Sequence, residues 1–480
     1  MISLRVSLNK FLLKMRGLQQ FCLFGGLVLA AAPLWAQVDN SGNLPPAPAP
    51  AVAEAESSDR STPKMVPPPP VSGQSFPTAL ASEERSNYLR GGVAFNAAYT
   101  DNLLGSVSAK PVSDASYSIW PNLEIDETTP RTTLVTSYAP GFTFYQRTSS
   151  RNEQDQNAAI NFQYGLSPHV TFSARDSFQK SSDVFNQPNP GLGTVSGGSQ
   201  PANLSVIAPV ADRLSNTGNV GLAYQFAANA MIGGSGNFSN LHYPDQAEVP
   251  GLVDSSSQSG LGFYSARVAR EHYIGASYQY QRLLSYPAGG QNLTQTDAFL
   301  FFYSFVPSTR FSMSLFGGPQ YASVGPQFAA SSAAPLAASK SWNPAAGGSL
   351  NWQARRSSFA ISYSHLVSGG GGLIGAVRLD SANASFRQQI TKTLNASLTG
   401  GYSQNDLLAA ASSAGGISQN GHTVSGTASL QQELGQHINL QLGYTRLHQD
   451  YSGVAVLAAT PNTNREFASL SYQFSRPLGR

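Results

Sequence analysis

Near the end of the chain stands the stretch Ile438-Asn439-Leu440-Gln441-Leu442-Gly443-Tyr444-Thr445, in which apolar residues alternate with small or polar ones. A period of two residues predicts a β-strand with one apolar and one polar face, because successive side chains of a strand point to opposite sides. In this strand we expect Leu440 to face an apolar environment and Gln441 a polar one. The same pattern recurs elsewhere, in Val93 to Tyr99, Ile160 to Tyr164, Val220 to Phe226 and Ala468 to Phe474.

The connections between such stretches alternate in length. Short connections fall at 126–131, 166–169, 227–230, 266–271, 306–310, 354–357, 390–393 and 433–436. Between them lie longer segments that are usually rich in Gly, Ser, Ala, Pro and Asn, such as 179–213, 242–258, 322–340, 404–421 and 446–464. Tight periplasmic turns that alternate with long outer loops are typical of bacterial outer-membrane barrels. The spacing predicts about 18 strands, an even number that leaves both ends of the barrel in the periplasm.

The composition of the 480 residues agrees with this class of protein. Charged residues make up 11% of the chain, whereas soluble domains average roughly 25%. A soluble β-sandwich would also show alternation, but its outer surface would carry almost no charge here. No stretch beyond residue 36 approaches the roughly 18 consecutive apolar residues of a membrane helix. The sequence therefore predicts an all-β fold, a transmembrane antiparallel up-and-down β-barrel.

Residues 1–36 are predicted to be a secretory signal peptide. Four basic residues precede an apolar stretch from Phe21 to Ala32, and the small residue Ala36 ends the segment. The sole cysteine, Cys22, lies within it, so the mature chain is expected to hold no disulfide and no cysteine metal site. Losing these basic residues leaves a nearly neutral mature chain, which argues against a nucleic-acid partner.

Residues 37–88 are predicted to be a disordered periplasmic linker. Pro, Ala, Ser and Glu dominate this segment, and Pro67-Pro68-Pro69-Pro70 stands near its middle. Such a composition buries too little apolar surface to fold. The barrel is expected to occupy residues 89–480.

Prolines also fall inside the expected strands, where each removes a ladder hydrogen bond. We expect all of them in the outer halves of their strands, where a bulge or an exposed strand end tolerates the loss. These prolines are Pro121, Pro140, Pro319 and Pro344.

Motifs for chemistry are scarce. The histidines show no paired metal-ligand spacing, and the chain has no phosphate-binding loop, no GxSxG and no CxxC. We therefore expect no catalytic, cofactor or metal site. Two glycine-rich runs stand out: 233–236, which suits close backbone approach within a strand, and 368–372, which suits a tight outer turn.

The polar faces of the strands are expected to line the barrel interior. The candidates are Glu124, Asn161, Gln163, Arg175, Gln225, Gln279, Asn351, Gln353, Asn383, Arg387, Asn439 and Gln441, with Asn395 and Gln473 beside them. Amides dominate this set, which favours neutral polar solutes over ions, although filler residues of a plugged barrel would look the same. The longest loop, 179–213, is the expected constriction.

A basic residue follows an aromatic one at the outer end of several apolar faces. The pairs are Phe178 and Lys180, Tyr280 and Arg282, Tyr363 and His365, and Tyr444 and Arg446. An interfacial aromatic followed by a snorkelling cation explains this order. A sharper hypothesis is that Lys180, Arg282, His365 and Arg446 bind the phosphates of outer-leaflet lipopolysaccharide.

Several short motifs resemble one family of proteins. They are Tyr99-Thr100-Asp101-Asn102, Gly317-Gly318-Pro319-Gln320-Tyr321, Trp342-Asn343-Pro344, Val367-Ser368-Gly369-Gly370-Gly371-Gly372-Leu373 and the tail that starts at Tyr472. Together they resemble the outer-membrane β-barrel porins of Gram-negative soil bacteria, some of which are associated with exopolysaccharide secretion. The resemblance implies a porin-like channel in the outer membrane, inserted by the barrel-assembly machinery. Barrel proteins commonly end on an aromatic residue, whereas this chain continues past Phe474.

We thus expect a channel for small polar, mainly neutral solutes. The alternatives are an exopolysaccharide export barrel and a plugged receptor or structural barrel.

Overall fold

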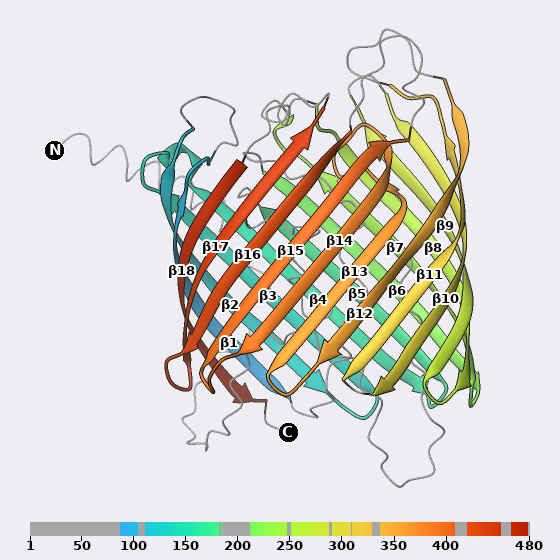
Figure 1. The fold of residues 1–480 in the computed structure, drawn as a ribbon, viewed down its shortest axis with the longest axis horizontal. Coiled ribbons are helices and arrows are strands. Elements are labelled where there is room, and N and C mark those ends of the chain that lie inside the picture. Colours follow the sequence, from blue (N-terminus) through green and yellow to red (C-terminus); the bar gives the residue numbers. More distant parts are fainter. Residues whose placement is uncertain are drawn as a thin grey trace, which may run out of the picture. The chain divides into compact units, whose positions relative to one another are not determined.

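The structure is a computed structural model that describes residues 87–103, 111–181, 185, 212–246, 251–287, 290–308, 310–328, 337–408, 420–452 and 462–478. These residues form eighteen long strands, which Figure 1 shows tilted in one direction around a barrel. The strands are β1 (Tyr88–Thr100), β2 (Asp114–Thr128), β3 (Thr132–Tyr145), β4 (Glu153–Ser167), β5 (Val170–Ser181), β6 (Arg213–Ala227), β7 (Ala230–His242), β8 (Asp254–Ala269), β9 (His272–Tyr286), β10 (Asn292–Ser308), β11 (Phe311–Val324), β12 (Ser339–Gln353), β13 (Ser357–Gly369), β14 (Ala376–Gln389), β15 (Leu394–Leu407), β16 (Gly421–Glu433), β17 (Ile438–Tyr451) and β18 (Asn462–Pro477).

The strands close into one sheet. Each strand pairs with its neighbours in chain order, and β1 pairs with β18 from Tyr88↔Pro477 to Thr100↔Arg465. All pairings are antiparallel. The predicted eighteen-stranded barrel and its eight short turns are therefore confirmed.

The described residues contain one short 3-10 helix, Ser149–Arg151. No helix in these ranges is long and apolar enough to cross a membrane.

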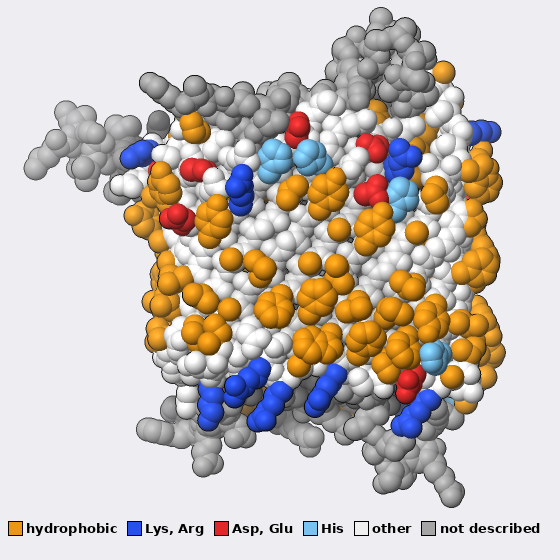
Figure 2. Space-filling view, in the orientation of Figure 1, with side chains coloured by type: hydrophobic (Ala, Val, Ile, Leu, Met, Phe, Trp, Pro, Cys, Tyr) orange, Lys and Arg blue, Asp and Glu red, His pale blue; other side chains and the backbone are white. Residues whose placement is uncertain are grey.

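The two faces of the sheet differ as the alternation predicts. On β17, Leu442 and Tyr444 are 49% and 42% exposed on the outer face, whereas Gln441 on the other face donates a hydrogen bond to Ser429. Figure 2 shows that apolar side chains form a band around the visible face, with charged side chains above and below it. A closed barrel with an apolar outer band is the form in which strands cross a membrane, because every backbone group at that depth is paired. The chain is an outer-membrane β-barrel of a Gram-negative bacterium.

The size of the barrel follows from its strand number. Eighteen strands spaced about 4.8 Å apart and tilted by about 40° close into a cylinder about 35 Å across between opposite backbones. Side chains cannot fill a lumen of that width by themselves. Any filling of the interior therefore comes from segments of the chain that fold into it.

Glycines on many strands lie under an aromatic ring from the neighbouring strand. A Cβ at Gly347 would come within 2.5 Å of Phe316, its partner in the ladder. Each ring thus lies flat on the wall over a position without a side chain, as in aromatic rescue of strand glycines. The pairs are Gly91/Phe474, Gly141/Trp120, Gly218/Phe238, Gly233/Phe263, Gly275/Phe302, Gly347/Phe316, Gly421/Tyr451 and Gly443/Phe467. Close backbone approach was predicted for the run that begins at Gly233, where a Cβ would also lie 2.7 Å from the Leu222 backbone oxygen.

The strand prolines lie opposite one another. Pro319 pairs directly with Pro344, and Pro121 and Pro140 fall within the interruption of the β2–β3 ladder between Ile119 and Leu123. The expectation that all four lie in outer halves is wrong for Pro121, which is at the midpoint of β2. Because the β2–β3 ladder already skips Pro121 and Pro140, the missing N–H groups of these two residues cost that ladder little.

The amino-terminal predictions fall largely outside the described residues. The signal peptide at 1–36 and residues 37–86 of the linker are not among them. The barrel itself begins at Tyr88, one residue earlier than expected.

The register can be tested at two adjacent positions. Leu442 faces outward opposite Leu430, in the middle of the apolar stretch of β17. We expect Leu442→Arg to lower the free energy of unfolding in lipid by about 2–4 kcal/mol, because the guanidinium would lie in hydrocarbon. Gln441→Arg is the control and should cost little. Urea unfolding of the barrel in lipid vesicles measures both, and equal losses would contradict the register.

Candidate functional site: the barrel interior

Small polar side chains line part of the inner wall. On β10 the inward positions begin with Asn292, Thr294 and Thr296, and on β8 with Ser255 and Ser257, all of which are buried. These positions alternate with outward residues that are less buried, as the two-residue period of a strand requires. The wall therefore presents hydroxyl and amide groups with few charges.

Each of the twelve predicted lining residues lies on the strand face opposite the exposed apolar side chains. Gln163 and Gln353 are exposed, Gln279 and Asn351 are buried, and the others are half-buried. In strand order, they are Glu124 on β2, Asn161 and Gln163 on β4, Arg175 on β5, Gln225 on β6, Gln279 on β9, Asn351 and Gln353 on β12, Asn383 and Arg387 on β14, and Asn439 and Gln441 on β17. Asn395 and Gln473 share this face of β15 and β18. Their part in transport remains a prediction.

Several charges on this face are already paired. Arg90 on β1 lies 3.1 Å from Glu124 and 3.7 Å from Asp126, near the periplasmic mouth. Arg175 donates from Nε to Asn161 at 3.1 Å across the β4–β5 ladder. The Arg90 charge is thus neutralised within the wall, whereas the Asn161 amide satisfies an N–H of Arg175 without cancelling its charge.

The chain between β13 and β14 folds into the barrel. Pairing between β12 and β13 stops at Ala346↔His365, and every residue from 366 to 377 is buried. We call residues 366–377 the inner hairpin. The glycine run 368–372 was expected to form a tight outer turn; it does connect β13 and β14 at the end that carries the longer loops, but it folds inward against the wall.

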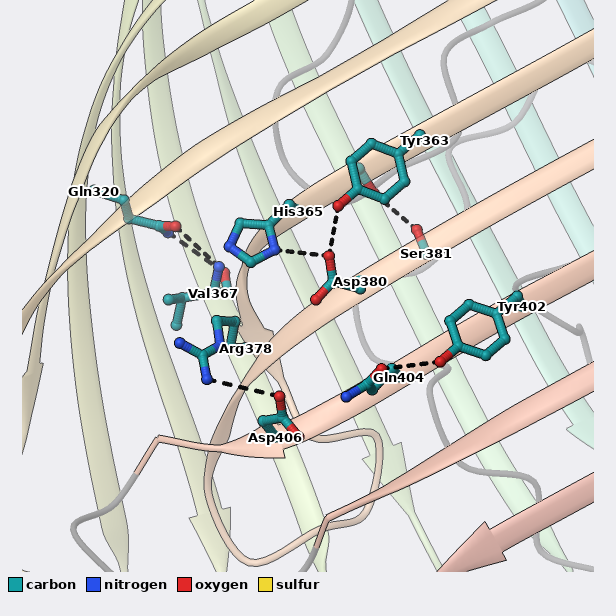
Figure 3. Close-up of polar contacts among 11 residues, drawn as sticks. Gln320, Tyr363, His365, Val367, Arg378, Asp380, Ser381, Tyr402, Gln404 and Asp406 are labelled. Carbon is teal, nitrogen blue, oxygen red and sulfur yellow. Dashed lines mark hydrogen bonds and ion pairs between the residues drawn. The ribbon is translucent and has the colours of Figure 1, made fainter.

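Hydrogen bonds attach the inner hairpin to strands that are distant around the barrel. The Gln320 side chain of β11 accepts from Val367 N at 2.9 Å and donates to Val367 O, as Figure 3 shows. Asn292 of β10 donates to Ile374 O at 2.9 Å. Val253 N, just before β8, donates to Gly372 O at 2.8 Å. The hairpin thus reaches the inner wall at β8, β10 and β11.

Apolar contacts complete this attachment. Leu373 and Val377 pack with Tyr243, Leu241 and Leu252. Burial raises the pKa of the Tyr243 hydroxyl, so the ring is neutral where the hairpin rests on it. The hairpin also places Val367 and Ala376 on Leu283 of β9. A segment held by both kinds of contact is a fixed part of the lumen.

Two glycines allow the tip of the inner hairpin to turn. Gly371 and Gly372 have φ values of 60° and 107°, a region that residues with a Cβ rarely adopt. A Cβ at Gly372 would also lie 2.7 Å from the Tyr243 hydroxyl. The tip therefore depends on glycine both for its turn and for its contact with the wall.

A second segment enters the lumen after β5. Phe185 packs against Leu447 of β17, and its ring lies 5.0 Å from the Arg465 guanidinium of β18. Both partners are inward residues on strands that are distant from β5 in the sheet. The loop at 179–213 thus starts inward, and most of it lies outside the described residues.

Apolar side chains on the inner wall form a cluster that was not predicted from the sequence. Leu300 and Phe302 of β10 pack with Phe316, Ala345 and Leu366, the first residue of the inner hairpin. The signal was present in β10, because residues 298–303 read Ala-Phe-Leu-Phe-Phe-Tyr and are apolar on both faces. A strand that is apolar on both sides must be covered on both sides.

The predicted outer-rim cations lie on the outward face, mostly beside a polar partner. Lys180 lies 3.0 Å from Asp212, and Arg446 donates to Asn462 at 3.5 Å. His365 lies 2.7 Å from Asp380, which also accepts a hydrogen bond from Tyr363 (Figure 3). Arg282 pairs with Gln258 and Gln295 in the ladders of β9. Binding of lipopolysaccharide by these residues remains a prediction.

Among the described residues, no group of His, Cys, Asp and Glu is arranged to hold a metal ion.

Comparison with known proteins finds solved structures of low similarity. No family model and no curated protein sequence matches this chain. Similar solved structures include the ferric citrate transporter FecA in unliganded form (9% identity, TM-score 0.39, covering 81% of this chain and 64% of that one). Others are OccAB4 of Acinetobacter baumannii (10%, 0.40, 83% and 100%) and OpdK of Pseudomonas aeruginosa with vanillate (9%, 0.39, 81% and 99%). This chain spans less than two thirds of the FecA chain, and likeness at this level carries no information on its solute.

The attachment of the inner hairpin can be tested with two glycines of nearly equal φ. Gly372 (107°) touches Tyr243, whereas Gly435 (108°), in the β16–β17 turn, has open space around it. Alanine at either position costs on the order of 1–3 kcal/mol of backbone strain. Only Gly372→Ala should also release the hairpin and expose its amides to rapid hydrogen exchange. Equal protection of residues 366–377 in the two variants would contradict this role of Gly372.

Proposed function

We propose that this barrel is a channel for small polar, mainly neutral solutes. The observation that carries the proposal is a polar wall narrowed from within by a hairpin attached at Val253, Asn292 and Gln320. A hydrogen-bonded hairpin inside a wide barrel reduces the passage from the width of the barrel to that of small molecules. The barrel supplies the passage, and the hairpin supplies the size limit.

The chemistry of the wall supports neutral solutes. Serine, threonine and amide side chains exchange hydrogen bonds with hydroxyl-rich molecules as they do with water. Sorting of ions relies on rings of one charge sign, whereas Arg90 on this wall faces Glu124 and Asp126. Weak ion selectivity is the expected consequence.

One alternative is favoured by the same hairpin. Its apolar contacts with Leu241, Tyr243 and Leu283 are those of a permanently closed plug as much as of a constriction. A plugged receptor or structural barrel is therefore the second candidate. Among the described residues, nothing favours an exopolysaccharide export barrel.

Planar-bilayer recording separates these candidates. The purified barrel should conduct in steady steps with K⁺ and Cl⁻ almost equally permeant, because the wall carries little net charge. Liposomes that contain it should swell in small neutral sugars. Gln320→Ala removes both side-chain bonds to Val367 and should raise the step conductance.

The matched control is Gln404→Ala, which removes one hydrogen bond, accepted from Tyr402, on the outward face of β15. It should leave the conductance unchanged. Absence of conductance in the native barrel, with steps in Gln320→Ala alone, would favour the plug. Absence of conductance in both would remove the channel proposal.

A further inference from the structure

The turns at the periplasmic end carry an arc of cations. Arg310 lies in the β10–β11 turn, Arg355 and Arg356 in the β12–β13 turn, and Lys392 in the β14–β15 turn. All four side chains are exposed. These are three successive turns along the same rim, and Figure 2 shows a row of Lys and Arg side chains below the apolar band. We call these four residues the basic arc.

The basic arc has no protein partner among the described residues. No ion pair or side-chain hydrogen bond joins any of its four side chains to another described group. The opposite rim differs, because Lys180 lies beside Asp212 and Arg378 beside Asp406. These two cations of the outer rim are thus neutralised within the protein, whereas the cations of the arc have no carboxylate paired with them among the described residues.

The basic arc stands directly below an aromatic row. Register places Phe311, Trp352, Phe359 and Phe386 side by side on successive strands, on the outward face. Trp352 is 43% exposed, as expected for a ring at a membrane interface. Arg310 immediately precedes Phe311, and Arg355 and Arg356 lie between Trp352 and Phe359 in the chain. The guanidinium groups therefore lie at the level of lipid headgroups.

The chemistry of the arginine side chains and the distance between successive turns indicate which anion the arc binds. Arginine presents parallel N–H groups that match the geometry of a phosphate. Successive turns are about 10 Å apart, twice the strand spacing, which is on the scale of neighbouring lipids. A soluble acidic partner would contact the end of the barrel, whereas the arc lies at the edge of the apolar band.

We propose that the basic arc binds anionic phospholipid headgroups of the periplasmic leaflet. The arc would give the barrel a shell of anionic lipid at one rim. Long basic side chains reach from the turn to the phosphate while their stems lie along apolar surface. The interaction is independent of whether the lumen conducts.

The test measures lipid association directly. The full barrel is reconstituted in vesicles of phosphatidylcholine with spin-labelled phosphatidylglycerol or phosphatidylcholine, and electron spin resonance gives the ratio of their association constants. We expect a ratio of several-fold for the native barrel that falls towards about 1 in R355Q/R356Q/K392Q. Raising the salt concentration should lower the native ratio in the same direction, because screening weakens headgroup contacts.

The matched control neutralises two cations at the other rim that are ion-paired with Asp212 and Asp406, in K180Q/R378Q. Their protein partners already satisfy them, so this variant should keep the native ratio. Heat-modifiable migration in gels confirms that both variants are folded barrels. A native ratio near one, an unchanged ratio in the arc variant, or an equal loss in both variants would overturn the proposal.

Discussion

Pairing of every backbone N–H and C=O group at membrane depth is the constraint on which this structure depends. Water cannot satisfy these groups in hydrocarbon, so a chain that crosses with strands must leave no open edge. Here the last edge disappears where β1 pairs with β18 over thirteen positions. The alternation of side chains follows, because a closed sheet has one face towards lipid and one towards its own lumen. Prolines, which supply no N–H, are accordingly placed opposite one another.

The sequence predicted the barrel because this constraint repeats in every strand. β17 alone, from Ile438 to Tyr451, shows both faces, and the short turns fix the strand number. The inner hairpin could not be predicted in this way. A glycine run such as 368–372 is compatible with an outer turn and with a buried one, and which it is depends on partners such as Gln320 and Asn292 that lie far away in the chain. Only the two-sided apolar pattern of β10 indicated that something covers the inner wall.

The interior shows how a wide barrel is narrowed from within. Aromatic rings on the inner wall, such as Phe316 and Phe467, lie flat over Gly347 and Gly443 rather than projecting into the lumen. Apolar surface that remains is covered by the inner hairpin, which joins Leu366 to the cluster around Leu300. The glycines thus leave the lumen wide, and the inner hairpin narrows the lumen at one level. The packing of the wall therefore depends on the ring-covered glycines, whereas the width of the lumen depends on the inner hairpin.

The seam between β1 and β18 has a consequence for how the protein is made. Its contacts join residues that are more than 360 positions apart, such as Thr100 and Arg465. At this seam the ring of Phe474 covers Gly91, so the first strand receives its packing from the last. A chain that is still being synthesised can form hairpins but has two unsatisfied edges until β18 exists. Insertion into the membrane therefore has to wait for the completed polypeptide, and the barrel depends on being kept unfolded and soluble until its final strand has been translated.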